Sequence, residues 1–383
     1  MKRSRLLPLF LTQSFRSVAV TFLGFFSSVY IYKQTLTLTA SQPRSLLAVA
    51  TFYLLLYFFK DLAVVLAENW AQRAGLKKQV TLGHWLTALT LIAFLLSQHN
   101  LAFVWWAGAL WGLSIGFFWF GRFGLMLKIS QRGKFGKTLG WAGILETLLL
   151  LGVPFSGGLL ISRLGYPALF LTAFGFVIFA LVILRWVPAQ KTHQDVRLGE
   201  ILRLFTNRKR VLLTYFSSGV RGTLYSTALM LYVFLVLEKE LAFGAFFSLA
   251  LLVVALTNFA TGSWVDRKGK KGLIAYGAVI SSLVWLGRFL TAGAGALLVL
   301  DVIDRISGGM LGIPLEVLTY EKALDGRSTG RALLFREMAV GAGEITACCL
   351  LVAIILLGWP LKVAFLVAAG FNLLPLLSLR WLK

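Results

Sequence analysis

The chain has 383 residues, of which 58% are apolar and only 14% are charged, and its mean hydropathy is +0.81. In a soluble domain about a quarter of the residues are charged. The composition therefore excludes an ordinary soluble protein and indicates a chain that crosses a bilayer repeatedly. The net charge of +23 would indicate nucleic-acid binding in a soluble protein, but the placement of the basic residues gives another reason for it.

The apolar runs form two sets of six, and a spanning helix needs roughly 20 residues. The first set falls at 17–36, 45–67, 79–97, 101–127, 139–161 and 166–187. The second falls at 211–236, 241–263, 272–291, 294–318, 333–357 and 361–380. The sequence therefore predicts an all-α integral membrane protein of 12 transmembrane helices. Its expected parts are a six-helix bundle at 1–187, a cytoplasmic linker at 188–210 and a second six-helix bundle at 211–383.

Lysine and arginine gather in cytoplasmic loops, and this bias sets the orientation. With the N-terminus inside, 27 of the 38 basic residues fall on the inner side, Arg16 among them. The outer ends hold 6, which are Lys33, Arg44, Arg163, Lys239, Arg288 and Lys362. We therefore expect both termini in the cytoplasm of a bacterial-type inner (plasma) membrane. The bias also accounts for most of the basic excess without a nucleic-acid partner.

Two segments lie outside the predicted spans. Met1–Phe10 is basic and then apolar, like a signal peptide, but it lacks a small-residue cleavage site, so we expect it to be retained. In the linker, Leu198, Ile201, Leu202 and Phe205 have helical spacing among charged residues, which predicts a short amphipathic helix on the inner membrane surface. The alternative is a solvated linker.

A motif between two apolar runs reappears 194 residues away in a weaker form. The stronger copy is Gly262, Asp266, Arg267, Gly269, Lys270 and Lys271, and the upstream copy keeps Trp70, Gln72, Arg73, Gly75 and Lys77. Gly112-x-x-x-Gly116 and Gly308-x-x-x-Gly312 correspond loosely, and such small residues let helices approach closely. Two copies with an even number of spans predict bundles related by a pseudo-two-fold axis along the membrane normal.

Six plus six spans, a cytoplasmic middle segment and this repeated motif resemble the major facilitator superfamily of secondary transporters. The first copy departs from the family pattern, because Glu68 stands at the leading glycine and Gln72 at the acid. The resemblance implies a gating role for Asp266, which would hold a neighbouring helix in the outward-facing state, together with Arg73, Gly75 and Lys77 in the first copy. Arg267, Lys270 and Lys271 would also bind anionic lipid.

In the fifth span, Gly143, Gly152, Pro154, Gly157 and Gly158 resemble the glycine-proline motif of the family's drug and metabolite antiporters. Proline lacks a backbone donor and weakens a helix locally. The plain alternative is a kinked packing helix without bearing on the direction of transport.

Ionisable side chains inside predicted spans are the candidate site, because each costs roughly 3 kcal/mol even on insertion scales. The family's cavity is lined mainly by the first, fourth, seventh and tenth spans, which implies Arg122, Arg221, Asp301, Asp304 and Arg305. Asp301 and Arg305 share a helix face at i,i+4, so a local pair without a transport role is the alternative.

Buried carboxylates suit proton coupling, and the candidates are Glu146, Glu344 and Asp304. Glu146 lies at a depth similar to that of Arg122, where the two can pair. Lys60 and Asp61 are adjacent in the second span, so we expect them to pair with other helices rather than with each other.

The sequence has no recognisable catalytic arrangement, cofactor motif or metal-ligand spacing among His84, His99 and His193. We therefore expect a monomeric secondary transporter rather than an enzyme, exporting a small amphipathic compound or metabolite in exchange with protons. Proton-coupled uptake of a sugar, nucleoside or organic anion is the first alternative. Movement of lipid or lysolipid is the second, and a non-transporting scaffold or receptor is the third.

Overall fold

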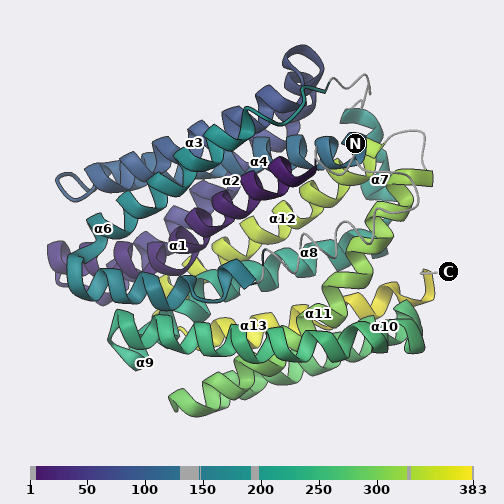
Figure 1. Cartoon of the computed structure of the whole chain (residues 1–383). Helices are drawn as coiled ribbons and strands as arrows, with labels where there is room; N and C mark the ends of the chain where they lie inside the picture. Colours follow the sequence, from purple (N-terminus) through teal and green to yellow (C-terminus); the bar gives the residue numbers. More distant parts are fainter. Residues whose placement is uncertain (1–5, 130–145, 147, 191–197, 326–328, 382–383) are drawn as a thin grey trace. The chain divides into compact units, whose positions relative to one another are not determined.

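The computed structural model describes residues 6–129, 146, 148–190, 198–325 and 329–381. It gives the backbone alone for 6, 127, 129, 198–202, 254, 256–270, 313–314, 316–325, 329–330, 332, 378 and 380–381. Its ordered elements are all helical, so the predicted all-α class is confirmed (Figure 1). Helices suit a bilayer because they satisfy their backbone hydrogen bonds internally. In the described residues eight helical segments are long and apolar enough to span a membrane, and Glu240–Val253 and Val363–Leu377 are shorter apolar helices. The full count of 12 spans stays a prediction.

The helices of the two halves follow the predicted runs. The first half forms α1 (Leu6–Thr39), α2 (Gln42–Ala74), α3 (Leu76–Leu96), α4 (Ala102–Ile129) and α6 (Val153–Leu184). The second forms α7 (Leu198–Asn207), α8 (Lys209–Leu224), the π-helical turn η2 (Tyr225–Leu229), α9 (Met230–Leu237), α10 (Glu240–Leu290), α11 (Ala294–Asp325), α12 (Thr329–Leu356), α13 (Val363–Phe371) and the 3₁₀ turn η3 (Leu374–Trp381).

The chain forms two compact units, and each is described by itself. The first holds residues 1–40 and 55–194, and the second holds 41–54 and 195–383. The division near residue 194 falls within the predicted linker, whereas residues 41–54, the start of α2, group with the second unit. In the first unit α1 packs on α6, and α3 packs on α4. In the second, α10 packs on α11, and α8 packs on α12.

Three elements differ from the predicted spans. α1 begins at Leu6, well before the predicted start at 17. α6 contains a kink at Gly165, whose φ of 80° separates the predicted fifth and sixth spans. α10 is one helical element through the predicted loop at 264–271, with the two predicted spans on its two parts.

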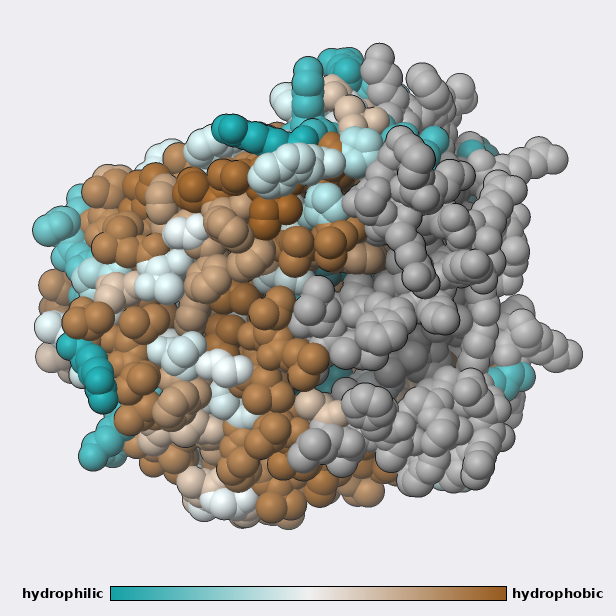
Figure 2. Space-filling model, viewed as in Figure 1, coloured by the Kyte–Doolittle hydropathy of each residue, from teal (hydrophilic) through white to brown (hydrophobic). Residues whose placement is uncertain are grey.

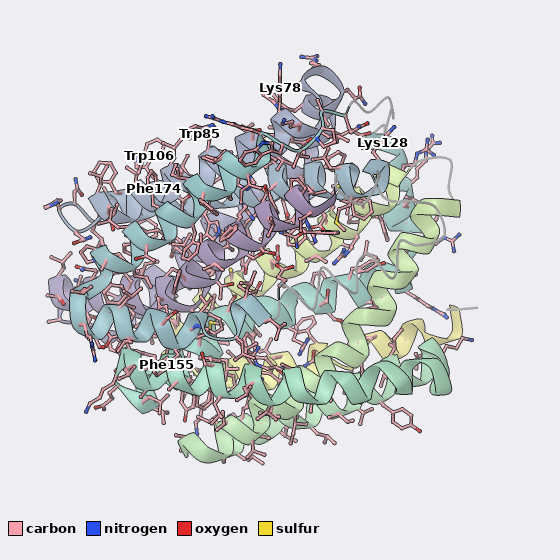
Figure 3. The ribbon with its side chains drawn as sticks, in the orientation of Figure 1. Lys78, Trp85, Trp106, Lys128, Phe155 and Phe174 are labelled. Atoms are coloured by element: carbon pink, nitrogen blue, oxygen red, sulfur yellow. The ribbon has the colours of Figure 1, made fainter. Side chains whose placement is uncertain are left out.

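In Figure 2 the coloured part of the surface is mostly apolar, and its hydrophilic residues gather toward the edges of that part. Large exposed side chains include Trp186, Leu290 and Leu164. On a soluble monomer an apolar surface of this extent would be exceptional, but on a membrane protein it is the surface that contacts lipid. In the first unit, Lys78 near the start of α3 and Lys128 near the end of α4 lie at the same end (Figure 3).

Glycines let α4 approach α2 closely. A Cβ at Gly112 would lie 2.1 Å from the Leu56 carbonyl oxygen, and one at Gly116 would lie 2.7 Å from that of Lys60. The close packing predicted for this glycine pair is therefore confirmed. The corresponding pair on α11 behaves differently. The three atoms nearest to a Cβ at Gly308 all belong to the Arg221 side chain, and no described atom lies within 4 Å of a Cβ at Gly312.

Candidate functional site

A set of polar side chains meets inside the first unit; we call Gln13, Arg16, Ser17, Arg122 and Glu146 the polar set. Arg122 Nε donates to Gln13 Oε1 at 2.6 Å, and Gln13 Nε2 donates to Glu146 Oε2 at 2.7 Å. Ser17 Oγ donates to Glu146 Oε1 at 2.5 Å. α1 supplies Gln13 and Ser17 together because residues four apart share a helix face. The structure thus brings the two predicted residues Arg122 and Glu146 together through a glutamine amide.

Arg16 is the member of the polar set that the sequence reasoning missed. Its side chain is 3% exposed, its Nη2 donates to Ser114 Oγ at 3.1 Å, and its Cζ lies 3.8 Å from the centroid of the Phe118 ring. No carboxylate contacts it in the described part of the chain, and its Nε has no hydrogen-bond partner there. The prediction of Arg16 on the cytoplasmic side, ahead of the first span, is wrong because α1 starts ten residues before it.

A short chain of hydroxyl groups faces this guanidinium. Thr87 Oγ1 donates to the Gly83 carbonyl at 2.9 Å and lies 3.0 Å from Ser114 Oγ. Because the Thr87 hydrogen is committed to Gly83, Ser114 donates to Thr87 and turns its lone pairs toward Arg16. Aligned dipoles of this kind stabilise a cation in a low-dielectric interior. They do so without neutralising its charge.

The second unit holds five charged side chains in contact, Arg221, Arg288, Asp301, Asp304 and Arg305, which we call the charge cluster. Arg288 Nη1 lies 3.0 Å from Asp304 Oδ2, and its Nη2 lies 3.2 Å from Asp301 Oδ1. Arg305 Nε lies 2.8 Å from Asp301 Oδ2, and Arg221 Nη2 lies 3.2 Å from Asp304 Oδ1. The local Asp301–Arg305 pair is therefore present, but as one part of a network that joins α8, α10 and α11.

Neutral groups complete the charge cluster. Ser281 Oγ on α10 donates to Asp304 Oδ1 at 2.9 Å, and Arg305 Nη2 donates to the Tyr225 hydroxyl. Tyr225 begins the π-helical turn, and such turns are frequent at functional sites. Its ring centroid lies 5.5 Å from the Arg305 Cζ. The aspartates are thus held by several donors each, which is what buried carboxylates need.

Arg288 is central to this network, although the sequence placed it at an outer membrane end. Its side chain is fully buried, and it bridges the two aspartates while its Cζ lies 4.6 Å from the Trp285 ring centroid. Its placement at a membrane end stays a prediction, since α10 ends at Leu290, but its burial was not anticipated. The side chain turns toward α11, where two carboxylates attract it.

The structure also describes three other in-span charges that the sequence singled out. Glu344 on α12 is half-buried, beside Cys348 on the same helix. Lys60 Nζ lies 3.4 Å from Asp61 Oδ1, so the expectation that these neighbours do not pair with each other is wrong. A lysine stem is long and flexible enough to bring its ammonium back over the adjacent residue.

The first copy of the repeated motif forms a hinge between α2 and α3. Gly75 has a φ of 89°, a left-handed conformation that favours glycine. The segment after α6 packs on this hinge, since Leu76 N donates to the Gln190 carbonyl at 2.9 Å and Lys77 Nζ to the Arg185 carbonyl at 2.9 Å. In the second copy Lys271 is exposed. The structure describes only the backbone of its other members, which are Gly262, Asp266, Arg267, Gly269 and Lys270. Their gating role stays a prediction.

Two other predicted segments are partly described. The helix is interrupted at Leu151 and Gly152, so Pro154 lies in the first turn of α6, where its missing donor is tolerated. Gly143 lies outside the described residues. α7 forms as predicted, and Phe205 contacts the Phe335 ring of α12 at 5.4 Å, so part of its apolar face packs on protein.

Comparison with known proteins agrees with this architecture. The profile of the Major Facilitator Superfamily matches residues 9–323. The chain is 26% identical over 281 residues to the uncharacterized protein YqgE of Bacillus subtilis (strain 168), a match that covers 68% of this chain and 64% of that relative.

Two solved structures are similar in fold. An auto-inhibited peptide transporter of the POT family superposes with a TM-score of 0.74 and 10% identity, covering 98% of this chain and 96% of that one. The human organic anion transporter MFSD10 (TETRAN) superposes with a TM-score of 0.69 and 14% identity, covering 99% of each. With a family match over most of its length, the chain belongs to the Major Facilitator Superfamily, and its long apolar helices identify it as an integral membrane protein.

Proposed function

We propose that the chain transports a small amphipathic organic anion by alternating access, in exchange with protons and in the direction of export. Arg16 carries the proposal. A buried guanidinium with a hydroxyl and a ring as its described partners retains an uncompensated positive charge. An isolated charge inside a protein is costly, so a site of this kind gains most from a ligand that is negatively charged.

The charges of the two units support the same substrate class. In the first unit, Arg16 has no carboxylate partner among the described residues, while Glu146 is linked to Arg122 through Gln13. The charge cluster has three guanidinium groups for two carboxylates. Guanidinium donors bind carboxylates and phosphates well because their fork of N–H groups matches two oxygen atoms. Apolar neighbours such as Phe118 and Trp119 favour an amphipathic ligand.

Among the three candidate proton carriers we propose Glu146. Its oxygens accept hydrogen bonds from the Gln13 amide and the Ser17 hydroxyl, which are neutral. In these contacts Glu146 is not the direct ion-pair partner of an arginine, so its protonation would leave no arginine without its partner. Asp304 is a poor carrier, because Arg288 and Arg221 both depend on its charge. We therefore assign Asp304 a structural role within the site.

Flux of three matched probes through the protein in proteoliposomes tests the substrate class. Naphthoate, naphthylmethylammonium and naphthylmethanol share one aromatic body and differ in charge. We expect naphthoate to be transported fastest, and Arg16→Gln to reduce its flux at least about tenfold, a loss of one charge-assisted contact. Arg44→Gln, at the start of α2, is the matched control and should leave it unchanged. Preference for the cation, or an Arg16→Gln variant with full naphthoate flux, would contradict the proposal.

Replacing Glu146 with glutamine tests proton coupling. Glutamine keeps the shape and one acceptor oxygen but has no carboxylate to protonate, so gradient-driven naphthoate flux should fall to the level measured without a proton gradient. Exchange of naphthoate across the membrane at equal pH should persist. Glu238→Gln, at an exposed carboxylate after α9, is the control. A variant that still accumulates naphthoate against its gradient would show that Glu146 is not the carrier.

The same vesicles separate the alternatives. Reversing the proton gradient distinguishes export from uptake by the side on which the probe accumulates. Movement of a fluorescent lysolipid between leaflets, without naphthoate flux, would favour a lipid transporter. Absence of flux for every probe would favour a scaffold or receptor.

A further inference from the structure

The Arg221 guanidinium lies directly against the backbone of α11 at Gly308. A Cβ built at Gly308 would lie 2.5 Å from Arg221 Nη2, 3.1 Å from Nη1 and 3.2 Å from Cζ. These distances are shorter than the roughly 3.5 Å of an ordinary contact between heavy atoms. Three atoms of the guanidinium therefore occupy the volume that any side chain at 308 would need.

This close approach gives one nitrogen two acceptors on the same residue. Arg221 Nη2 donates to the Asp304 carbonyl at 3.1 Å and to Asp304 Oδ1 at 3.2 Å. In a helix that carbonyl also accepts the backbone N–H of residue 308, four positions later. Ser307 Oγ donates to it as well, at 3.0 Å. The Asp304 carbonyl therefore accepts a hydrogen bond within α11 and is still accessible to Arg221 of α8, because Gly308 has no side chain to cover it.

We infer that Gly308 is the positioning residue for Arg221. Because residue 308 has no side chain, the Arg221 guanidinium of α8 reaches both the main chain and the carboxylate of Asp304. This role of Gly308 differs from that of a small residue that lets two helices pack closely. The inference rests on the proposed function only in so far as Arg221 belongs to the anion site. The other glycine of the pair, Gly312, has nothing within 4 Å of a built Cβ and has no such role.

A double-mutant cycle on the purified protein tests the inference without knowledge of the substrate. Gly308→Ala should lower the midpoint of thermal unfolding by about 3 to 6 °C, since the guanidinium must leave its place. In the Arg221→Gln background the same change should shift the midpoint by less than about 1 °C, because the group it displaces is absent. Gly312→Ala should have no such effect in either background.

Equal effects of Gly308→Ala in both backgrounds would overturn the inference, because glycine would then matter for reasons unrelated to Arg221. If Gly308→Ala alone does not fold, recovery of a folded protein in Gly308→Ala/Arg221→Gln supports the inference, and failure to recover overturns it. Naphthoate flux through the same variants reports separately on the proposed function. Absence of flux in the wild-type protein would reject that function and leave the unfolding cycle to decide the role of Gly308.

Discussion

Replacing Asp304 with asparagine should lower the free energy of unfolding by about 3–5 kcal/mol, the usual effect of removing one partner of a buried ion pair. Asparagine fills the same volume, so the loss is electrostatic. Arg288 is fully buried and would lose the oxygen that lies 3.0 Å from its Nη1, while Arg221 would lose its carboxylate partner. Thermal unfolding of the purified protein in detergent measures the change as a lower midpoint.

A second substitution shows whether the excess positive charge is the cause. In the Asp304→Asn variant Arg288 keeps only Asp301, which it shares with Arg305. Arg288→Met in that background removes this excess charge and keeps an apolar chain of similar length, so the midpoint should rise again. The pair between Arg305 and Asp301 remains in the double variant. Glu238→Gln changes an exposed carboxylate and should leave the midpoint where it is. If Asp304→Asn unfolds with the wild-type midpoint, the charge cluster does not stabilise the second unit.

Gly219→Ala should be among the most damaging of the single-methyl substitutions in the second unit. A Cβ at Gly219 of α8 would lie 2.1 Å from the Val340 carbonyl oxygen of α12, and one at Gly343 of α12 would lie 2.1 Å from the Phe216 carbonyl oxygen. The obstacles are backbone atoms, so the helices would have to separate by about 1.4 Å to lengthen a 2.1 Å approach to an ordinary contact of roughly 3.5 Å. We expect a loss of at least about 1–3 kcal/mol, as for overpacked cores.

Gly222→Ala is a control on the same helix, less than one turn away. Nothing lies within 4 Å of a Cβ there, so alanine should be neutral or should stabilise α8 by about 0.5–1 kcal/mol through its better helix propensity. The yield of monodisperse protein and the unfolding midpoint compare the two variants. A Gly219→Ala protein as stable as Gly222→Ala would mean that α8 and α12 do not meet as closely as described.

The features predictable from sequence are those that depend on neighbours along one helix or on average apolarity. The all-helical class follows from apolar runs, the Asp301–Arg305 pair from i,i+4 spacing, and the hinge at Gly75 from a motif. Close packing at Gly112 and Gly116 follows from their spacing. Each of these needs no knowledge of which helix lies opposite.

Arg16 and Arg288 escaped prediction for a common reason. An averaged hydropathy profile ends a predicted span where charged side chains occur. Inside a helical bundle, however, a charged side chain can be stabilised by polar partners instead of water. Arg16 lies among Gln13, Ser14 and Ser17, which lower the local average, although α1 continues past them. The sequence carries no comparable signal for Arg288, because Arg221 and Arg305 already match Asp301 and Asp304 in number. Which face of α10 presents it depends on tertiary packing.

The amide of Gln13 joins Arg122 to Glu146 through an oxygen at one end and a nitrogen at the other. Such a group transmits polarisation but is a poor conductor of protons, because passage would require an imidic acid form of the amide. Glu146 and Arg122 are therefore coupled electrostatically through the amide, but the amide does not pass a proton between them. If Glu146 carries the proton as proposed, this amide keeps the proton of the protonated carboxyl group from passing to the arginine side, so the carboxyl group must gain and lose its proton along a different path.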